Sequence, residues 1–328
     1  MARTVQVTGG QHSRLLGIGS YRPRRVVSNA EVCRAIGSTD EWIRARSGIE
    51  ERRFAGPDET LLLMSAAAAD KAIAQAGTDP ASIDLVLVAS MSNLVQTPPL
   101  GVTVACELGA SSAAAIDLSA ACAGFCHALA VASDAIRAGS AGQVLVIGAE
   151  RMTDIVEPSD RTIAFLFADG AGAAVVGAAD SPGIGPVVRR ADGALSETLR
   201  MSASWADDGE RPWMRMDGRR VFRWAVDEVT PAARRALELA GVAPDELGAF
   251  VPHQANLRMI EMMAARLSFG PRTVVARDVV RYGNTSAASV PLALETLLSK
   301  GHVPSGATAL LVGFGAGLNF AAQTVVLP

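Results

Sequence analysis

The sequence predicts an α/β protein built from two similar halves, because stretches of the first half recur in the second. Residues 72–88 (AIAQAGTDPASIDLVLV) can be laid over 236–252 (ALELAGVAPDELGAFVP), which matches Gly77 to Gly241 at an offset of 164 residues. Each stretch is typical of a helix, a glycine turn and a buried strand. Helix–turn–strand units that repeat in this way favour alternating helices and strands around buried sheets.

A second pair of stretches has nearly the same offset. Residues 139–148 (GSAGQVLVIG) resemble 301–313 (GHVPSGATALLVG) at offsets of 162 to 165 residues. Two matches in the same order indicate an internal duplication. A proline- and glycine-rich stretch at 178–185 marks the boundary, so we expect two halves at 12–180 and 181–328, after a polar leader of eleven residues.

The individual elements follow from periodicity and end signals. In chain order we expect a strand at 13–20, helices at 29–36, 40–46 and 60–76, a strand at 84–90, a helix at 101–108, a strand ending near 118 with a helix reaching 138, and a strand at 250–252. Ser28 and Asn29 stand where a cap begins the first helix, and the stretch 38–42 is typical of the start of the second. Gly48 and Gly77 stand where helices end.

Composition narrows the class of protein. The chain has 328 residues, 49% of them hydrophobic and 19% charged, which is enough for a large core. A net charge of -3 gives no reason to expect a nucleic-acid or anionic-membrane partner, and no run of 18 apolar residues predicts a membrane span. We therefore expect a cytoplasmic protein. Its four cysteines lack metal-ligand pairing with histidines, so no metal site is expected, and disulfides are not expected in a cytosolic protein.

Cys122 is the first candidate for chemistry. It follows a strand-like stretch and precedes an alanine-rich helical stretch, with only small side chains beside it. The positive end of a helix lowers the pKa of a nearby thiol and favours the nucleophilic thiolate. A cysteine among alanines can equally be part of the core.

The duplication brings further polar residues to corresponding places. Adding 164 to Cys122 gives Ser286, within the stretch GNTS that also contains Asn284. His253 follows the strand at 250–252 and matches Ala89 at the end of the earlier strand. Strand ends are where open α/β sheets bind ligands. Taken singly, the histidine could be structural and the Asn-Thr-Ser stretch a helix cap.

Several motifs together resemble the β-ketoacyl-acyl carrier protein synthase III family of thiolase-like condensing enzymes. They are SAACAGF around Cys122, VPHQANLRMI with His253, GNTSAASVP with Asn284, GFGAG at 313–317, DEWIRARSGIEERR at 40–53 and FADGAGAAVVG at 167–177. The resemblance extends from about residue 14 to the C-terminus. It implies a thiolase-like fold whose two duplicated halves form five layers, α/β/α/β/α.

The resemblance also implies a role for each residue. Cys122 would take an acyl group from acyl-CoA, and the backbone N–H groups of Cys122 and Ala316 would form the oxyanion hole. His253 and Asn284 would donate hydrogen bonds to the thioester carbonyl of malonyl-acyl carrier protein. They would stabilise the enolate that remains after decarboxylation, and its carbon would attack the acyl-Cys122 thioester.

Substrate contacts carry over in the same way. The resemblance places Trp42, Arg46 and Arg161 at the nucleotide end of CoA, and a stacked ring with guanidinium groups suits an adenine nucleotide. It places Gly218, Phe222 and Asn256 along the pantetheine tunnel. Arg223, Arg258 and Arg266 could form a basic patch for an acidic acyl carrier protein. Trp42 could instead be a helix anchor, and these arginines ordinary solvated residues.

Three stretches look closer to enzymes of this family that prime bacterial aromatic polyketide synthesis: ACAGFCHALA, VQTPPL and MDGRRVFRWAV. Thr97 has the approximate position of a residue that closes the acyl pocket across a homodimer. A threonine there predicts a deeper pocket and a starter larger than acetyl. No bound cofactor is implied, because acyl-CoA is a substrate. Fatty-acid initiation stays open.

Other function classes are less consistent with the residues. Acyl transfer or thioester hydrolysis on the same scaffold would not need both His253 and Asn284. A non-catalytic partner subunit would be expected to lack Cys122. Papain-like hydrolysis uses similar residue types, but its local signature around cysteine differs.

Overall fold

The computed structural model describes residues 12–209 and 211–328, so the expected leader lies outside them. Two five-stranded sheets share one strand order, β1-β7-β6-β4-β5 in the first and β8-β14-β13-β11-β12 in the second. The first sheet consists of β1 (His12–Tyr21), β4 (Leu85–Ala89), β5 (Ala114–Leu118), β6 (Gln143–Arg151) and β7 (Asp169–Ala179). The second consists of β8 (Val188–Ala191), β11 (Ala249–Pro252), β12 (Val274–Val275), β13 (Thr308–Gly315) and β14 (Asn319–Val326).

Strand directions repeat between the sheets as well. In each sheet the first three strands pair antiparallel and the last three pair parallel. The same topology in both halves confirms the predicted duplication.

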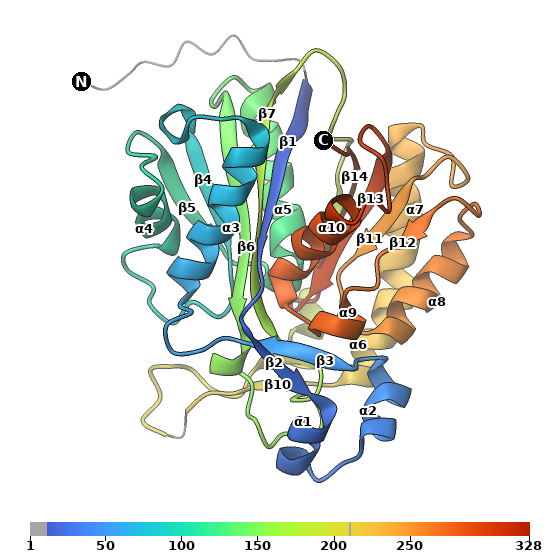
Figure 1. The fold of residues 1–328 in the computed structure, drawn as a ribbon. Helices are drawn as coiled ribbons and strands as arrows, with labels where there is room; N and C mark the ends of the chain where they lie inside the picture. Colours follow the sequence, from blue (N-terminus) through green and yellow to red (C-terminus); the bar gives the residue numbers. More distant parts are fainter. Residues whose placement is uncertain (1–11, 210) are drawn as a thin grey trace.

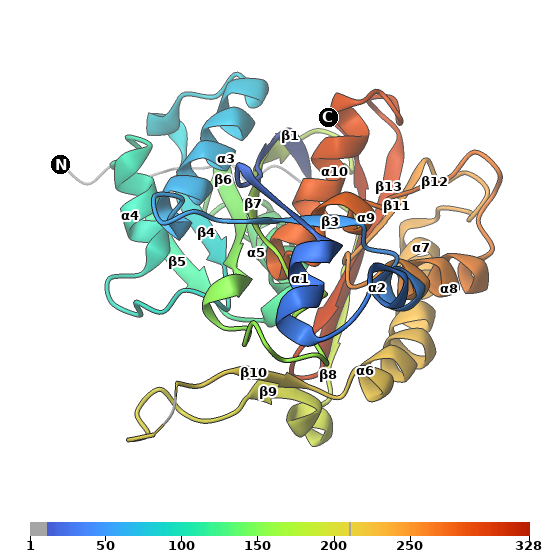
Figure 2. The same ribbon diagram turned by 60° about the horizontal axis from the view of Figure 1, so that its bottom comes forward.

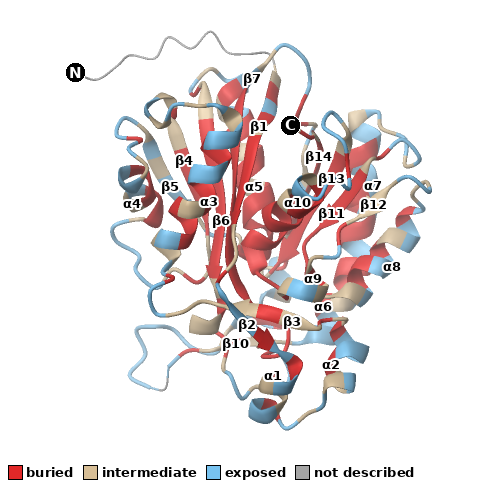
Figure 3. Cartoon of the chain, in the orientation of Figure 1, coloured by how far each residue is buried: buried red, intermediate tan, exposed pale blue. Residues whose placement is uncertain are grey.

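Helices cover the sheets in layers (Figure 1). The outer helices α3 (Leu61–Ala76) and α4 (Leu100–Glu107) pack on the first sheet, and α7 (Thr230–Ala240) packs on the second with α8 (Leu257–Leu267) beside it. Between the sheets lie α5 (Gly124–Arg137) and α10 (Ser289–Ser299). The arrangement is therefore the five-layer α/β/α/β/α order. Burial is greatest in the sheets and the two central helices, as Figure 3 shows.

Smaller elements gather at one end of the layers, around the carboxyl ends of β4, β6 and β11 (Figure 2). They are β2 (Arg25–Ser28), α1 (Asn29–Ile36), α2 (Asp40–Ser47), β3 (Glu51–Phe54), β9 (Leu199–Met201), β10 (Met214–Met216), α6 (Gly218–Trp224) and α9 (Val279–Tyr282). Short helical turns complete the chain: η1 (Pro80–Ser82), η2 (Ala121–Ala123), η3 (Met152–Asp154), η4 (Gly193–Thr198), η5 (Ala225–Val229) and η6 (Ser286–Ala288).

The predicted helix ends agree with the structure. The Ser28 and Thr39 hydroxyls accept hydrogen bonds from backbone N–H groups of α1 and α2. The matched glycines Gly77 and Gly241 end α3 and α7 with left-handed φ angles of 62° and 66°. Glycine adopts this conformation without the steric cost that other residues meet.

One predicted correspondence is wrong by a residue. Ala121 and Ser286, rather than Cys122 and Ser286, occupy equal places, because they begin η2 and η6 and have φ angles of 47° and 49°. Counted from the strand ends that the sequence matches, the segment before α10 is one residue longer than the corresponding segment before α5. Cys122 therefore corresponds to Ala287. Within the described residues, no helix is long and apolar enough to cross a membrane.

Candidate active site

Cys122 lies in η2, directly before α5 and between the two sheets. Its exposed fraction is 4%. Gly315, at the end of β13, packs against it so closely that an added Cβ would stand 2.8 Å from the Cys122 Cβ. The absence of a side chain at 315 is therefore what lets the two backbones meet around the thiol.

The sequence predicts a lowered thiol pKa, and this prediction is wrong for Cys122. Burial raises the pKa to about 12, and the nearby carboxylate of Glu150 adds to the rise, whereas a hydrogen bond with Ser286 opposes it. In this buried site, the free-energy cost of removing a thiolate from water is larger than the stabilisation that the helix end gives it. The Cys122 proton must therefore move during attack.

His253 follows β11 and is 2% exposed. Its Nδ1 lies 2.7 Å from the hydroxyl of Ser289 on α10, and its ring meets Phe314 edge-on with centroids 5.1 Å apart. Burial lowers the histidine pKa to about 3, so the ring is neutral. When Ser289 donates to Nδ1, Nε2 carries the proton and becomes a donor.

Asn284 precedes η6 and is 4% exposed. Its backbone is held by the first half of the chain: Asn284 N–H donates to the Leu166 carbonyl, and Ala168 N–H donates to the Asn284 carbonyl, both at 2.8 Å. The Ser286 N–H donates to Asn284 Oδ1 at 2.9 Å. The oxygen is thus occupied, which leaves the Nδ2 protons to donate elsewhere.

The turn after β13 completes this site. Ala316 directly follows Gly315, and its carbonyl accepts a hydrogen bond from the Asn319 side chain. Gly315 packs against Cys122, so the backbone of this turn runs beside the thiol. Ser286 connects Cys122 to Asn284, and Phe314, the residue before Gly315, packs against His253.

A cavity of about 960 Å³ leads away from Asn284. All predicted CoA and carrier-protein residues line it: Trp42, Arg46, Arg161, Gly218, Phe222, Arg223, Asn256, Arg258 and Arg266. At its far end the Arg46 and Arg161 guanidinium carbons lie 4.4 and 5.0 Å from the Trp42 ring centroid. Trp42 also packs edge-on against Phe165, with ring centroids 5.0 Å apart, so it is both an anchor and a stacking surface.

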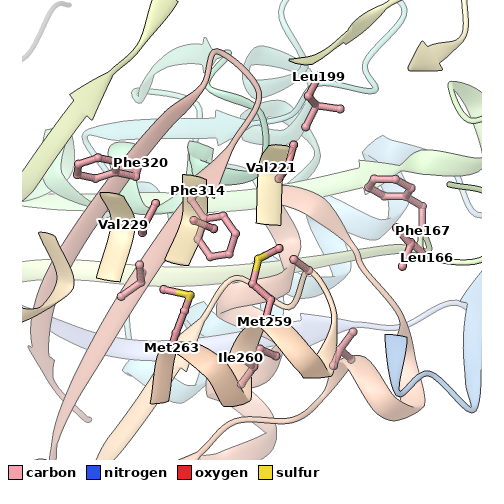
Figure 4. Close-up of a cluster of buried hydrophobic side chains, with 14 of the residues drawn as sticks. Leu166, Phe167, Leu199, Val221, Val229, Met259, Ile260, Met263, Phe314 and Phe320 are labelled. Carbon is pink, nitrogen blue, oxygen red and sulfur yellow. The ribbon is translucent and has the colours of Figure 1, made fainter. Parts of the chain in front are cut away.

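The walls of this cavity are held by a buried apolar cluster. Figure 4 shows Val221 close to Met259 within that cluster, and Leu166 beside Phe167 at its right. Val221, Met259 and Leu166 line the cavity. Asn256 caps α8 by accepting the Met259 N–H at 2.9 Å, so its oxygen is already engaged. Gly218 begins α6, where Asp217 accepts the first N–H groups.

The predicted basic patch is weaker than its three arginines suggest. Arg223 and Arg258 are exposed at the cavity mouth. Arg266 donates to Asp227 at 2.9 Å, so its positive charge is already paired. Of the three predicted arginines, Arg223 and Arg258 therefore supply most of the positive charge at the cavity mouth.

A second cavity, of about 400 Å³, lies on another side of η2. It is lined by Met91, Ser119, Ala120, Ala121, Leu199, Arg200, Met201, Met214, Ala316, Gly317 and Asn319. Thr97 lines neither this cavity nor the larger one. It is exposed, six residues after Met91 on the loop between β4 and α4.

Sequence analysis missed Glu150, Ser289 and Phe314. Glu150 is fully buried at the end of β6 and hydrogen-bonds Ser286. An acidic residue near the carboxyl end of an otherwise apolar strand, QVLVIGAER, was a usable signal. Ser289 had none, because its contact with His253 comes from the fold. Within the described residues, no cluster of three or more histidine, cysteine or acidic side chains could hold a metal ion.

Two family models match this chain. The model described as 3-oxoacyl-[acyl-carrier-protein (ACP)] synthase III matches residues 116–193, and its C-terminal counterpart matches 237–327. A Streptomyces lividans protein named beta-ketoacyl-[acyl-carrier-protein] synthase III is 56% identical over 99% of this chain and 97% of its own length.

Solved structures agree with those matches. The priming β-ketosynthase of the R1128 polyketide biosynthetic pathway is 56% identical, with a TM-score of 0.96 over 99% of each chain. The 3-oxoacyl-[acyl-carrier-protein] synthase III of Aquifex aeolicus is 36% identical, with a TM-score of 0.89 over 96% of this chain and 99% of that one. The fold is thus thiolase-like.

Proposed function

The chain belongs to the 3-oxoacyl-[acyl-carrier-protein] synthase III family of condensing enzymes, and from that premise we propose a two-step acyltransferase reaction at Cys122. Cys122 takes an acyl starter from acyl-CoA. The acyl group is then condensed with malonyl-acyl carrier protein by decarboxylative Claisen chemistry. The product, a β-ketoacyl-acyl carrier protein, begins polyketide or fatty-acid synthesis.

The orientation of the two donors supports condensation most directly. Asn284 Oδ1 is occupied by the Ser286 N–H, and His253 Nδ1 is occupied by Ser289. Asn284 Nδ2 and His253 Nε2 are left to donate to one thioester carbonyl, where they stabilise an enolate. A hydrolase would need His253 as a base for water, but burial holds its pKa near 3.

A negative oxygen forms on the acyl carbon in each step, first when Cys122 attacks acyl-CoA and then when the enolate attacks the acyl-Cys122 thioester. The N–H groups of Cys122 and Ala316 are fixed by the close packing of Gly315 on Cys122, so they can meet this oxygen without rearrangement. Acyl transfer in this site uses side chains and backbone groups alone, and acyl-CoA enters as a substrate.

The larger cavity is our proposed CoA tunnel. Trp42 offers a ring for the adenine, and the neighbouring Arg46 and Arg161 guanidinium groups offer positive charge for the phosphates. The pantetheine arm passes Gly218, Phe222 and Asn256 toward Asn284. Arg223 and Arg258 at the mouth contact the acidic carrier protein, with a smaller contribution from the paired Arg266.

We also propose a homodimer built on the edge strand β5. Ile116 on this strand is 53% exposed, and Val95 and Val102 nearby are 62% and 45% exposed. An exposed edge with apolar side chains is a pairing surface, and a two-fold axis matches it to itself. Thr97 on the adjoining loop then reaches the partner's acyl pocket. We place this enzyme in the cytoplasm, with its two thioester substrates.

The second cavity is our proposed acyl pocket. Two of its lining residues lie next to the site of attack in the sequence: Ala121 precedes Cys122, and Ala316 follows Gly315. Met91, which also lines this cavity, belongs to the same loop as Thr97. Its volume of about 400 Å³ favours a starter larger than acetyl. The similarity to a priming β-ketosynthase favours the polyketide role over fatty-acid initiation. We propose that the two structural halves span residues 12–180 and 181–328.

Intact-mass spectrometry after mixing the protein with acetyl-, propionyl-, butyryl- and hexanoyl-CoA tests this proposal. We expect one acyl mass on the wild type, none on Cys122→Ala, and wild-type loading on Cys126→Ala, the buried cysteine one turn away. A Cys122→Ala variant that still gained the acyl mass would refute the assignment. Strong preference for acetyl would refute the larger-starter proposal only.

A further inference from the structure

Glu150 is a buried carboxylate that the reaction above leaves unused. It is fully buried, and no arginine or lysine pairs with it within the described part of the chain. Its oxygens accept hydrogen bonds from the hydroxyls of Ser90, Ser92 and Ser286 and from the N–H groups of Met91, Ser92 and Ala287. A buried charge is costly unless such contacts hold it, so its presence here calls for a role.

Ser286 connects this carboxylate to the nucleophile. Its hydroxyl donates to Glu150 Oε1 at 3.0 Å. The same hydroxyl hydrogen-bonds the Cys122 sulfur, and this contact lowers the thiol pKa because it favours the thiolate. A hydroxyl has one proton and two lone pairs, so while its proton is donated to the carboxylate the oxygen can accept the thiol proton. Ser286 has a φ of 49°, and its N–H is bonded to Asn284, so its position is fixed.

The other buried base near Cys122 suits this task less well. Burial lowers the pKa of His253 to about 3, and its Nδ1 is engaged by Ser289. Burial instead raises the pKa of Glu150 to about 7, which is suited to exchanging a proton at neutral pH. The groups facing Glu150 are the hydroxyls and N–H groups named above and the Cys122 thiol, which is the one titratable group among them.

We propose that Glu150 accepts the thiol proton of Cys122 through the hydroxyl of Ser286 as the sulfur attacks acyl-CoA. The S–H bond breaks as the bond from sulfur to the acyl carbon forms. The proton passes to Ser286 Oγ, whose own proton passes to the carboxylate. Collapse of the tetrahedral intermediate breaks the acyl bond to CoA, and the CoA thiolate takes a proton from solvent.

Condensation runs the relay in reverse. The enolate carbon attacks the acyl group, and Cys122 leaves as a thiolate. Protonated Glu150 then returns its proton through Ser286 to the sulfur, which restores the starting state. Glu150 and Ser286 thus act on the nucleophile in both half-reactions, whereas His253 and Asn284 act on the malonyl thioester. This proposal rests on the proposed role of Cys122.

The test is single-turnover loading of the thioester that the wild type loads best, followed by quench and intact mass. Ser286→Gly removes the hydroxyl and suits the left-handed backbone, and Glu150→Gln removes the acceptor. We expect loading at neutral pH to slow about 100-fold in both. The wild-type rate should fall as the pH drops through about 7, the pKa of Glu150, and both variants should lose this step.

Ser92→Ala is the matched control, because Ser92 also donates to Glu150 but has no contact with Cys122 among its hydrogen bonds. Above the pH step it should load within about threefold of the wild type. The step itself should move to higher pH, because the Ser92 hydrogen bond lowers the pKa of Glu150. Decarboxylation of malonyl-acyl carrier protein needs no Cys122 proton, and glycine at 286 keeps the N–H that holds Asn284, so decarboxylation should fall by far less than loading in Ser286→Gly.

Two results would overturn the relay. One is wild-type loading with an unchanged pH profile in both variants. The other is an equal loss of loading and decarboxylation in Ser286→Gly and Ser92→Ala, which would indicate a structural role. If the wild type itself gained no acyl mass at Cys122, the proposed function would fail instead, so the two failures can be told apart.

Discussion

Gly315 lies so close to Cys122 that an added Cβ would stand 2.8 Å from the cysteine Cβ and 2.9 Å from its backbone nitrogen. Real side-chain atoms do not approach backbone this closely, so any residue larger than glycine must move η2 or the end of β13. Those are the two segments whose N–H groups we propose as the oxyanion hole.

Gly315→Ala should therefore reduce acyl loading by about 100-fold or more, because the hole loses its geometry. Overpacking should also lower the free energy of unfolding by roughly 1–3 kcal/mol. Loading by intact mass and urea denaturation measure the two effects. Gly193→Ala is the control, since an added Cβ there meets nothing within 4 Å. Full loading in Gly315→Ala would contradict this account of the hole.

At the scale of elements, β5 differs from the other strands of its sheet. It has no buried residue, although Ala114–Leu118 is mostly apolar, and it stands at the sheet edge. An apolar edge strand exposed to solvent invites pairing with another chain. β5 ends four residues before Cys122, so pairing of this strand with another chain would also help to fix the position of the thiol.

Ile116→Glu should shift the protein from dimer to monomer in size-exclusion chromatography with light scattering, because it places charges opposite each other across the two-fold axis. Leu239→Glu on α7 is the matched control: Leu239 is 44% exposed and lies in the outer helix layer of the second half. We expect it to stay dimeric. A monomeric wild type would contradict the proposed homodimer, and an unchanged Ile116→Glu dimer would place the interface elsewhere.

At the scale of the whole molecule, buried carboxylates make stability depend on pH. Burial raises the pKa of Asp169 from its usual 3.8 to about 6, although N–H groups of Ala55 and Thr153 donate to it. The unfolded chain loses this proton near its ordinary pKa while the folded chain keeps it. The stabilisation is complete below pH 3.8 and is lost as the pH rises through about 6.

The wild type should therefore lose roughly 3 kcal/mol relative to Asp169→Asn between those two pH values. Urea denaturation of both proteins across that range measures the difference. Asp58→Asn should behave oppositely, because Arg24 lowers the pKa of this exposed carboxyl. Parallel curves for the wild type and Asp169→Asn would show that Asp169 does not titrate as its burial requires.

Much of the fold could be predicted because local signals mark its repeats. Gly77 and Gly241 end matched helices, and each is followed by a matched buried strand. Cys122 and His253 could be picked out as candidates because each follows a strand, and Asn284 because it precedes a helical segment. The one-residue error at Ser286 arose because sequence offsets do not show where a loop gains a residue.

Other features depend on contacts between distant segments. Ser289 meets His253, and Asp227 pairs with Arg266, only because the fold brings their helices together. The raised thiol pKa of Cys122 comes from burial by both halves, which a helix-end argument does not include. The exposure of Ile116 reflects the sheet order, since the strand's composition alone suggests a buried position.

The most direct test of the condensing role is a chase of acyl-loaded enzyme. Protein loaded on Cys122 is freed of acyl-CoA and mixed with malonyl-acyl carrier protein, and the carrier protein is weighed by intact mass. We predict a β-ketoacyl mass with the wild type. His253→Ala and Asn284→Ala should still load but form this product more than about 100-fold slower. Release of the free acid with the carrier protein unchanged would contradict the account and indicate hydrolysis.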